Sequence, residues 1–322
     1  MTFQVHMQGD LPPEFLQAHG LPWFDALQVK GLDWYNLWRF HNSCPAKFRH
    51  EERDAGNVTA IAEHAAILNP SEFERRFIRE PAKEDYPHAL TSDKDICSWL
   101  KEKGVGGYSG KKFDELMTLV DRTGEKPLVW NNFIAEFHAS IGNKSAVKAS
   151  DFDKILQMRA VIFANKKYGE KLTDSFNDVI IAGEIDGLKI HVRYDAMTPK
   201  GGFFDYVACT NASAEEFAQQ AIRGGYYLKQ ALLHDVFVAH YEIAPAEQSF
   251  LAQEKSFPHI PMWHKVPEMM LQIGRIQYKS AIAMYKQCVE KNVWPDYSLG
   301  QEVDDLPVPE YYARKYGLGE KK

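Results

Sequence analysis

HVRYDAMTPKGGFFDYV, the stretch from His191 to Val207, decides the fold because it reads as two strands joined by a glycine-containing turn at residues 198–202. Asp195 follows the first strand and Asp205 lies in the second, so a hairpin would bring two carboxylates to one end of a sheet. Two converging carboxylates are the ligands that a hard divalent cation prefers, although both residues also suit solvated positions beside a turn. The stretch therefore predicts a hairpin and a candidate metal site.

The composition is that of an ordinary soluble globular protein of 322 residues. The formal net charge of −6 argues against a basic protein that coats nucleic acid, so any such contact must come from local patches. Four scattered cysteines without a C-x-x-C pair argue against a zinc ribbon or a disulfide framework and indicate a reducing cytoplasm. The N-terminus lacks a secretory pattern, and charged residues interrupt the most apolar window, 226–241, so no membrane partner is expected.

Hydrophobic periodicity predicts helices on both sides of a strand-rich centre, with an N-terminal cap at Ser92 and Asp95 and a capping box formed by Ser213 and Glu216. The predicted helices cover residues 32–41, 57–68, 71–77, 130–140, 151–168, 213–223, 226–238 and 267–292, and the predicted strands lie in 179–207 and 249–255. The predicted units are an irregular arm at 1–30, a core at 31–81 and 123–300, a module at 91–122 and a tail at 301–322. This order predicts an α/β fold with a curved sheet flanked by helices.

Residues 91–122 have the pattern of a separate module in which two short amphipathic helices flank a glycine-rich loop, and they resemble SAP-like helix-extension-helix DNA-binding motifs. Lys111 and Lys112 open the second helix, where free backbone N–H groups favour phosphate. Both lysines are therefore candidate DNA contacts, although a hairpin that only packs on the core fits the same pattern. The lysine-rich segment 144–171 could likewise follow a DNA backbone or be a solvated helix face.

Three further residues in predicted helices have side chains that could take part in catalysis or in metal binding. His64 lies among apolar neighbours, and Tyr227 and Gln230 are spaced to share one helix face. Taken singly, each fits a packed core at least as well as an active site.

In their order along the chain, these residues resemble the RecE family, the exonuclease VIII type of PD-(D/E)XK nucleases found in phages and prophages. The segments that carry the resemblance are HAAILNPSEFERRFIREP, GEIDGLKIHVRYD, DYVACTNASAEEFAQQAIRGGYYLKQALLHD and SFLAQEKSFP. They cover most of residues 32–81 and 151–295. The resemblance implies a restriction-endonuclease-like core, with a curved mixed sheet flanked by helices and a small helical insert.

The resemblance also implies a function and a set of site residues. It implies a Mg²⁺- or Mn²⁺-dependent 5′-to-3′ exonuclease that acts on double-stranded DNA ends in phage-type recombination. The expected assembly is a homo-oligomeric ring such as a tetramer, with a single-strand annealing protein as partner. By position, the implied metal ligands are His64, Asp195 and Asp205. Tyr227 and Gln230 match the helix motif and are expected to act in catalysis by positioning water or phosphate. Glu184 matches a strand glutamate, and Arg193 is expected to contact DNA.

Val207 departs from the family pattern, which places a catalytic lysine there to offset charge on the scissile phosphate. Lys229 or Lys189 could supply the missing charge, and Lys229 is therefore counted among the candidate catalytic residues. Alternatively, the protein binds DNA or assembles without cutting, or position 207 records an altered residue. A protein-binding phage effector on the same scaffold is a further alternative.

Overall fold

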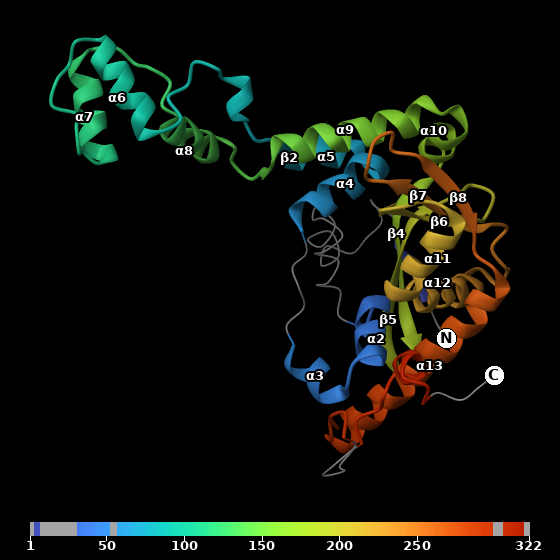
Figure 1. The fold of residues 1–322 in the computed structure, drawn as a ribbon. Helices are drawn as coiled ribbons and strands as arrows, with labels where there is room; N and C mark the ends of the chain where they lie inside the picture. The colour runs from blue at the N-terminus through green and yellow to red at the C-terminus, as the bar shows by residue number, and fades with distance from the viewer. Residues whose placement is uncertain (1–2, 7–30, 52–56, 299–304, 319–322) are drawn as a thin grey trace.

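A computed structural model describes residues 3–6, 31–51, 57–298 and 305–318, and the central feature of these residues is a six-stranded sheet (Figure 1). Its order is β1-β4-β5-β6-β7-β8. The strands are β1 (Phe3–His6), β4 (Phe176–Ile185), β5 (Leu188–Met197), β6 (Phe203–Cys209), β7 (Gln248–Glu254) and β8 (Pro261–Lys265). Strands β6 and β7 are parallel and the other neighbours are antiparallel. The sheet is therefore mixed, and the predicted α/β class is confirmed.

Helices cover both faces of this sheet, because successive strand residues point to opposite sides. Phe203 is buried on one face against helices α2 (Trp34–Asn42), α12 (Tyr226–Tyr241) and α13 (Glu268–Lys291). Phe204, the next residue, is buried on the other face. The helices of that second layer are α4 (Val58–Leu68), α9 (Ala149–Ala164) and α10 (Lys166–Thr173). Each layer has its own apolar core, and the hairpin residues contribute to both.

Shorter elements extend the two layers. α5 (Pro70–Arg76) leads into a parallel pair of strands, and α11 (Ala214–Arg223) precedes α12. The remaining elements are α3 (Pro45–His50), β2 (Phe77–Arg79), η2 (Lys83–Asp85), β3 (Ser145–Val147), α8 (Trp130–Ser140) and α14 (Glu310–Lys315). Among the described residues, no helix has the length and apolar character needed to cross a membrane.

The module at 91–122 consists of α6 (Asp93–Glu102) and α7 (Phe113–Arg122), and Figure 1 shows it projecting away from the sheet beyond α8. Leu100 and Leu116 are fully buried in a small apolar core that the two helices share. The predicted cap is confirmed, because the Asp95 N–H donates to the Ser92 hydroxyl. This module therefore has a core separate from the core of the sheet.

The structure corrects four sequence expectations. Phe3–His6 of the predicted irregular arm form the edge strand β1, and residues 7–30 lie outside the described part. The Ser213 side chain makes no capping bond, and its backbone N–H donates to the side chain of Asn211 and not to that of Glu216. Asn165 divides the expected helix at 151–168 because its side chain caps a new helix there. The predicted tail contains the short helix α14.

Two glycines set how α12 lies against its neighbours. Gly225 precedes α12 with a φ of 73°, and a Cβ there would overlap the Trp38 ring of α2. A Cβ on Gly274 of α13 would overlap the backbone carbonyl of Tyr227 at the start of α12. Because neither position has room for a side chain, α12 packs closely against both helices.

Candidate active site

Strands β5 and β6 separate immediately beyond the hairpin turn. They are in register only at Ala196–Phe204 and Met197–Phe203, after which β5 continues along β4 and β6 along β7. Asp195 and Asp205 are the next residues on the two strands, and the Tyr206 N–H donates to Asp195 Oδ2 over 3.1 Å. The side chain of Asp195 thus takes the place of a backbone acceptor. The sheet opens where the two carboxylates lie.

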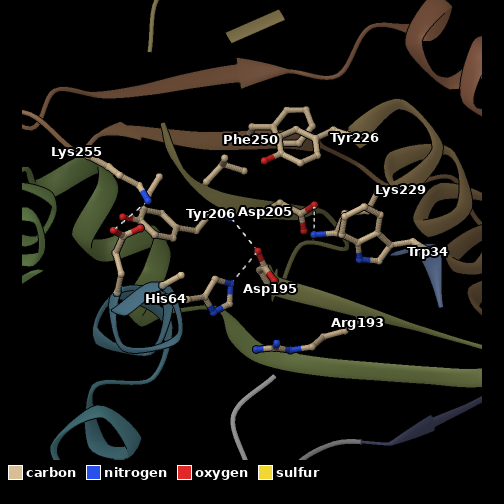
Figure 2. Close-up of a pocket in the computed structure, with 14 residues that line it drawn as sticks. Trp34, His64, Arg193, Asp195, Asp205, Tyr206, Tyr226, Lys229, Phe250 and Lys255 are labelled. Carbon is tan, nitrogen blue, oxygen red and sulfur yellow. Dashed lines mark hydrogen bonds and ion pairs between the residues drawn. The ribbon is translucent and has the colours of Figure 1, made fainter. Parts of the chain in front are cut away.

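A cavity of about 280 Å³ occupies this opening and is reached by side chains from both helical layers (Figure 2). Its lining includes five residues singled out from the sequence. These are His64, Arg193, Asp195, Asp205 and Lys229. Position 207 also lines the cavity, as expected for a residue two positions after Asp205 on the same strand face. The sequence therefore predicted much of the charged lining, although its members come from four different elements.

His64 approaches Asp195 from helix α4. Its Nε2 atom lies 3.2 Å from Asp195 Oδ2, and both side chains are largely buried. Burial would raise the pKa of Asp195, but the positive charge of Lys229, the contact with His64 and the positive charge of Arg193 hold that pKa well below its usual range. Asp195 is therefore ionised at neutral pH.

Asp205 is almost completely buried, and its two oxygens have different surroundings. Oδ2 receives the ammonium of Lys229 at 2.7 Å and the side-chain amide nitrogen of Gln230 at 2.6 Å. Oδ1 is buried without a hydrogen-bond partner. Burial raises the pKa of Asp205 against the opposing charge of Lys229, and the negative charge of Asp195 adds to the rise. The pKa of Asp195 is thus lowered and that of Asp205 is raised, although both carboxyl groups line one cavity.

Lys229 is a buried cation on helix α12, with a side chain that is 13% exposed. Its ammonium faces Asp205 and also lies 5.5 Å from the centre of the Trp34 ring, within range of a cation–π contact. Burial would lower the pKa of Lys229, but the two aspartates raise it, so the ammonium remains charged. Lys189, the other candidate, is exposed and does not line the cavity. Of the two lysines, the fold brings Lys229 to the carboxylates.

The sequence analysis missed several residues of the cavity. Glu63 is buried beside His64, and its carboxylate lies 3.6 Å from the ammonium of Lys255. Burial raises the pKa of Glu63, while Lys255 opposes that rise. The aromatic side chains of Trp34, Tyr226 and Phe250 form much of the remaining wall. Glu63 stands out only as a charge within an apolar helix, and Lys255 only as a charge after an apolar strand, which are weak signals.

Three predicted residues lie elsewhere. Tyr227 does not line the cavity but packs with the apolar cluster around Phe217 and Met270, and its neighbour Tyr226 lines the cavity instead. Lys111 and Lys112 belong to the module beyond α8, far from the carboxylates in Figure 1. Lys111 is paired with Glu115 at 2.9 Å, which offsets part of the charge expected to attract phosphate.

The two remaining predicted residues are Arg193 and Glu184, and only one of them lines the cavity. Arg193 lines the cavity and forms an ion pair with Asp178. Glu184 is exposed on β4 and does not line the cavity.

The donor set fits a hard divalent cation in its chemistry. Asp195 and Asp205 both line one cavity with their carboxyl groups, and the buried Oδ1 of Asp205 lacks a hydrogen-bond partner among the described residues. Within the described part of the chain, no three His, Cys, Asp or Glu side chains already cluster as metal ligands. A cation would therefore compete with His64 for Asp195 and use the oxygen of Asp205 that Lys229 leaves free.

Comparison with known proteins gives a family match and a match to a solved structure. A family model described as "PDDEXK-like domain of unknown function (DUF3799)" matches residues 115–304. A crystal structure of a protein named "Putative exonuclease", from Eubacterium rectale, superposes with a TM-score of 0.53 at 12% sequence identity. That match covers 94% of this chain and 97% of the other. No curated protein matches the sequence. At this identity the structural match shows a shared fold, which agrees with the predicted PD-(D/E)XK core.

Proposed function

Because the chain belongs to the family of PDDEXK-like domains (DUF3799), we propose that it is a metal-dependent nuclease of the RecE type that acts on the ends of double-stranded DNA. The observation that carries this proposal is the pairing of Lys229 with Asp205, 2.7 Å apart beside Asp195. An ammonium at this place supplies the charge that Val207 lacks. The cavity thus combines two acids, a histidine and a lysine despite the departure in the sequence motif.

Each residue has a role in phosphodiester hydrolysis. Asp195 and Asp205, with support from His64, would hold a Mg²⁺ or Mn²⁺ ion, which would polarise the phosphate and lower the pKa of an attacking water. Lys229 would offset negative charge that builds on the phosphate, since its ammonium is buried and already oriented. Gln230 donates a hydrogen bond to Asp205 and does not itself line the cavity.

The finer features of the proposal rest on the resemblance to RecE, and the name "Putative exonuclease" of the E. rectale protein supports only the exonuclease mode. They comprise 5′-to-3′ polarity, a role in phage-type recombination, a homo-oligomeric ring and a single-strand annealing partner. The module at 91–122 would contact duplex DNA through Lys111 and Lys112, and Arg193 would contact DNA at the cavity.

The direct test follows degradation of a linear duplex labelled at either its 5′ or its 3′ end, with Mg²⁺ and with EDTA. We expect metal-dependent release of nucleotides that begins at the 5′ ends. Lys229→Met should lower the rate by about 10²–10³-fold, because a buried charge next to the reacting phosphate is lost. Lys189→Met is the matched control, since that lysine is exposed and outside the cavity. An equal loss in both variants would contradict the assignment of Lys229.

A relocated lysine gives a sharper test of the same idea. Position 207 lines the same cavity, so Val207→Lys should restore part of the rate when combined with Lys229→Met. The measurement is the rate on the labelled duplex for both single variants and the double variant. If the double variant is no faster than Lys229→Met, a lysine at 207 cannot replace the ammonium of Lys229.

Val207 also supports a second candidate function, that of a protein that binds DNA ends without cutting them. It predicts retention of duplex in a mobility-shift assay together with intact DNA after incubation with Mg²⁺ or Mn²⁺. Cleavage that Asp195→Ala abolishes would exclude this alternative.

A further inference from the structure

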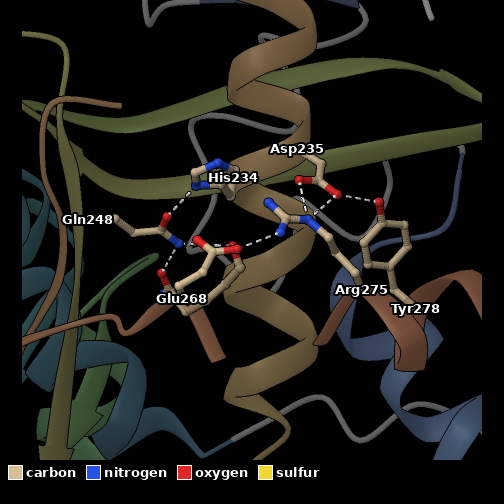
Figure 3. Close-up of polar contacts among 7 residues, drawn as sticks. His234, Asp235, Gln248, Glu268, Arg275 and Tyr278 are labelled. Atoms are coloured by element: carbon tan, nitrogen blue, oxygen red, sulfur yellow. Dashed lines mark hydrogen bonds and ion pairs between the residues drawn. The ribbon is translucent and has the colours of Figure 1, made fainter. Parts of the chain in front are cut away.

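Asp205 is connected to the protein interior by hydrogen bonds that run away from the cavity. Gln230 of α12 donates to Asp205, Gln248 of β7 donates to Gln230, and His234 of α12 contacts Gln248. The donor–acceptor distances are 2.6, 2.7 and 2.8 Å in that order. Figure 3 shows the outer part of this chain, with His234 and Gln248 facing each other between helix and strand. We call these four side chains the Asp205 relay.

The direction of the relay is fixed by one backbone group. The side-chain nitrogen of Gln248 lies 2.9 Å from the carbonyl oxygen of Gln230, and a carbonyl can only accept. The nitrogen end of the Gln248 amide must therefore face Gln230, and its oxygen must face His234. That oxygen in turn requires a donor, so Nδ1 of His234 carries a proton. Neutral and protonated imidazole both satisfy this requirement.

The same nitrogen of Gln248 has a second hydrogen, which it donates to the side-chain oxygen of Gln230. An amide whose oxygen is held in this way presents its nitrogen at the opposite end, toward Asp205. Gln230 is completely buried, so solvent cannot substitute for these partners. Without Gln248, the side-chain oxygen of Gln230 loses its donor, so the bond to Asp205 would have to hold the orientation of this amide by itself.

The consequence falls on Asp205. Gln230 and Lys229 both contact Oδ2, while Oδ1 is buried without a partner among the described residues and Asp205 itself lines the cavity. A carboxylate held through one oxygen has a fixed rotation, so its second oxygen points in a constant direction. If the Gln230 amide turned, two oxygens would face each other and the carboxylate would rotate away.

We propose that Gln248 and His234 are positioning residues that orient Gln230 so that Asp205 presents its free oxygen to a divalent cation. This inference rests on the proposed function, because it assumes that the cavity takes a metal ion. It assigns a role to two residues outside the cavity lining, one on β7 and one on the third turn of α12. Neighbouring groups that orient metal ligands typically change metal affinity by 10–100-fold when they are removed.

The test measures Mn²⁺ binding to the full-length protein by isothermal titration calorimetry, without DNA. Gln248→Met should weaken Mn²⁺ binding by about 10-fold or more, because the Gln230 amide loses its orienting donor. His234→Leu should weaken binding in the same direction. His234→Asn should keep most of the affinity, because its amide nitrogen can take the place of the Nδ1 donor.

Arg275→Met is the matched structural control. Arg275 of α13 pairs with Asp235, the residue after His234 on α12, so its loss disturbs the same helix without touching the relay (Figure 3). We expect a lower melting temperature with unchanged Mn²⁺ affinity. Weakening in Gln248→Met and in Arg275→Met alike would overturn the proposal, because a general loss of packing would then explain both.

The outcomes separate this inference from the proposed function. Unaltered Mn²⁺ affinity in both Gln248→Met and His234→Leu, beside tight binding by the parent protein, would overturn the relay alone. Absence of Mn²⁺ binding by the parent protein would overturn the metal site and the relay together. Circular dichroism of each variant shows whether it is folded, and the two independent positions keep the test decisive if one variant does not fold.

Discussion

At the scale of single residues, the unequal surroundings of the two Asp205 oxygens are the most informative feature. One oxygen receives two donors, and the other is buried with none. A buried polar atom without a partner costs roughly 1–3 kcal/mol. The protein thus keeps a destabilising group at the centre of its cavity, which a bound cation would satisfy.

This arrangement predicts that divalent metal stabilises the fold. Mg²⁺ or Mn²⁺ should raise the melting temperature measured by differential scanning fluorimetry, by an amount equivalent to about 2.7 kcal/mol at a concentration 100 times Kd. Asp205→Asn should remove most of the increase because it removes an anionic ligand. Asp121→Asn, an exposed position on α7, is the control and should respond as the parent does. An undiminished response in Asp205→Asn would show that the metal binds elsewhere.

At the scale of elements, helix α12 determines how deeply the ammonium of Lys229 lies in the cavity. Its first turns carry Tyr226 and Lys229 into the cavity and Gln230 onto Asp205. The helix is held against α13 where Gly274 meets the backbone of Tyr227. Packing at Gly274 therefore sets the position of the residues that follow Tyr227 along the helix.

Gly274→Ala should consequently destabilise the protein. The added methyl group overlaps a backbone carbonyl, which cannot move without shifting α12, and overpacking of this kind costs about 1–3 kcal/mol. The free energy of unfolding in urea measures the effect. Gly106→Ala is the matched control, since a Cβ there meets open space. Equal stability of both variants would mean that the interface between α12 and α13 can accommodate the added methyl group.

At the scale of the whole molecule, the residues that line the cavity and the module at 91–122 lie in different places. Figure 1 shows the module beyond α8, while the cavity lies within the sheet. The module has its own apolar core, which allows changes on its surface without loss of the main fold. DNA affinity and metal affinity are therefore expected to be separable.

Replacing Lys111 and Lys112 together by glutamate tests this separation. We expect weaker binding of duplex DNA and a salt dependence that is shallower by about one unit of slope per lost phosphate contact. Mn²⁺ binding should not change, because neither residue lines the cavity. Fluorescence anisotropy at several salt concentrations gives the slope, and Lys126→Glu, an exposed lysine beyond the helix pair, is the control. Unchanged DNA affinity would assign the module a packing role.

The sequence predicted what depends on short-range pattern. The hairpin at 191–207, the helix at 57–68 and the capped helix after Ser92 follow from periodicity and turn chemistry, and the structure has them. Asp195 and Asp205 were predicted to approach each other because the hairpin joins them.

The remaining features depend on contacts between distant segments. A three-residue spacing on α12 placed Tyr227 beside Gln230, but the packing of the helix brings Tyr226 and Lys229 to the cavity. The hydrogen bond between Gln248 and Gln230 joins a strand to a helix, and no local sequence pattern predicts it. Edge strand β1 lies in a segment that reads as irregular, because its pairing with β4 comes from the far half of the chain.

Because β5 and β6 separate, a charged side chain can reach the cavity from a strand or from a helix. Since the opening admits side chains from both faces of the sheet, the chemistry depends on which charges reach the gap and not on which strand carries them. Under the proposed function, the ammonium of Lys229 from a helix takes the place of one from a strand, which would leave the residue at 207 free to change. Descent within such a fold can therefore preserve an electrostatic arrangement while its sequence signature disappears.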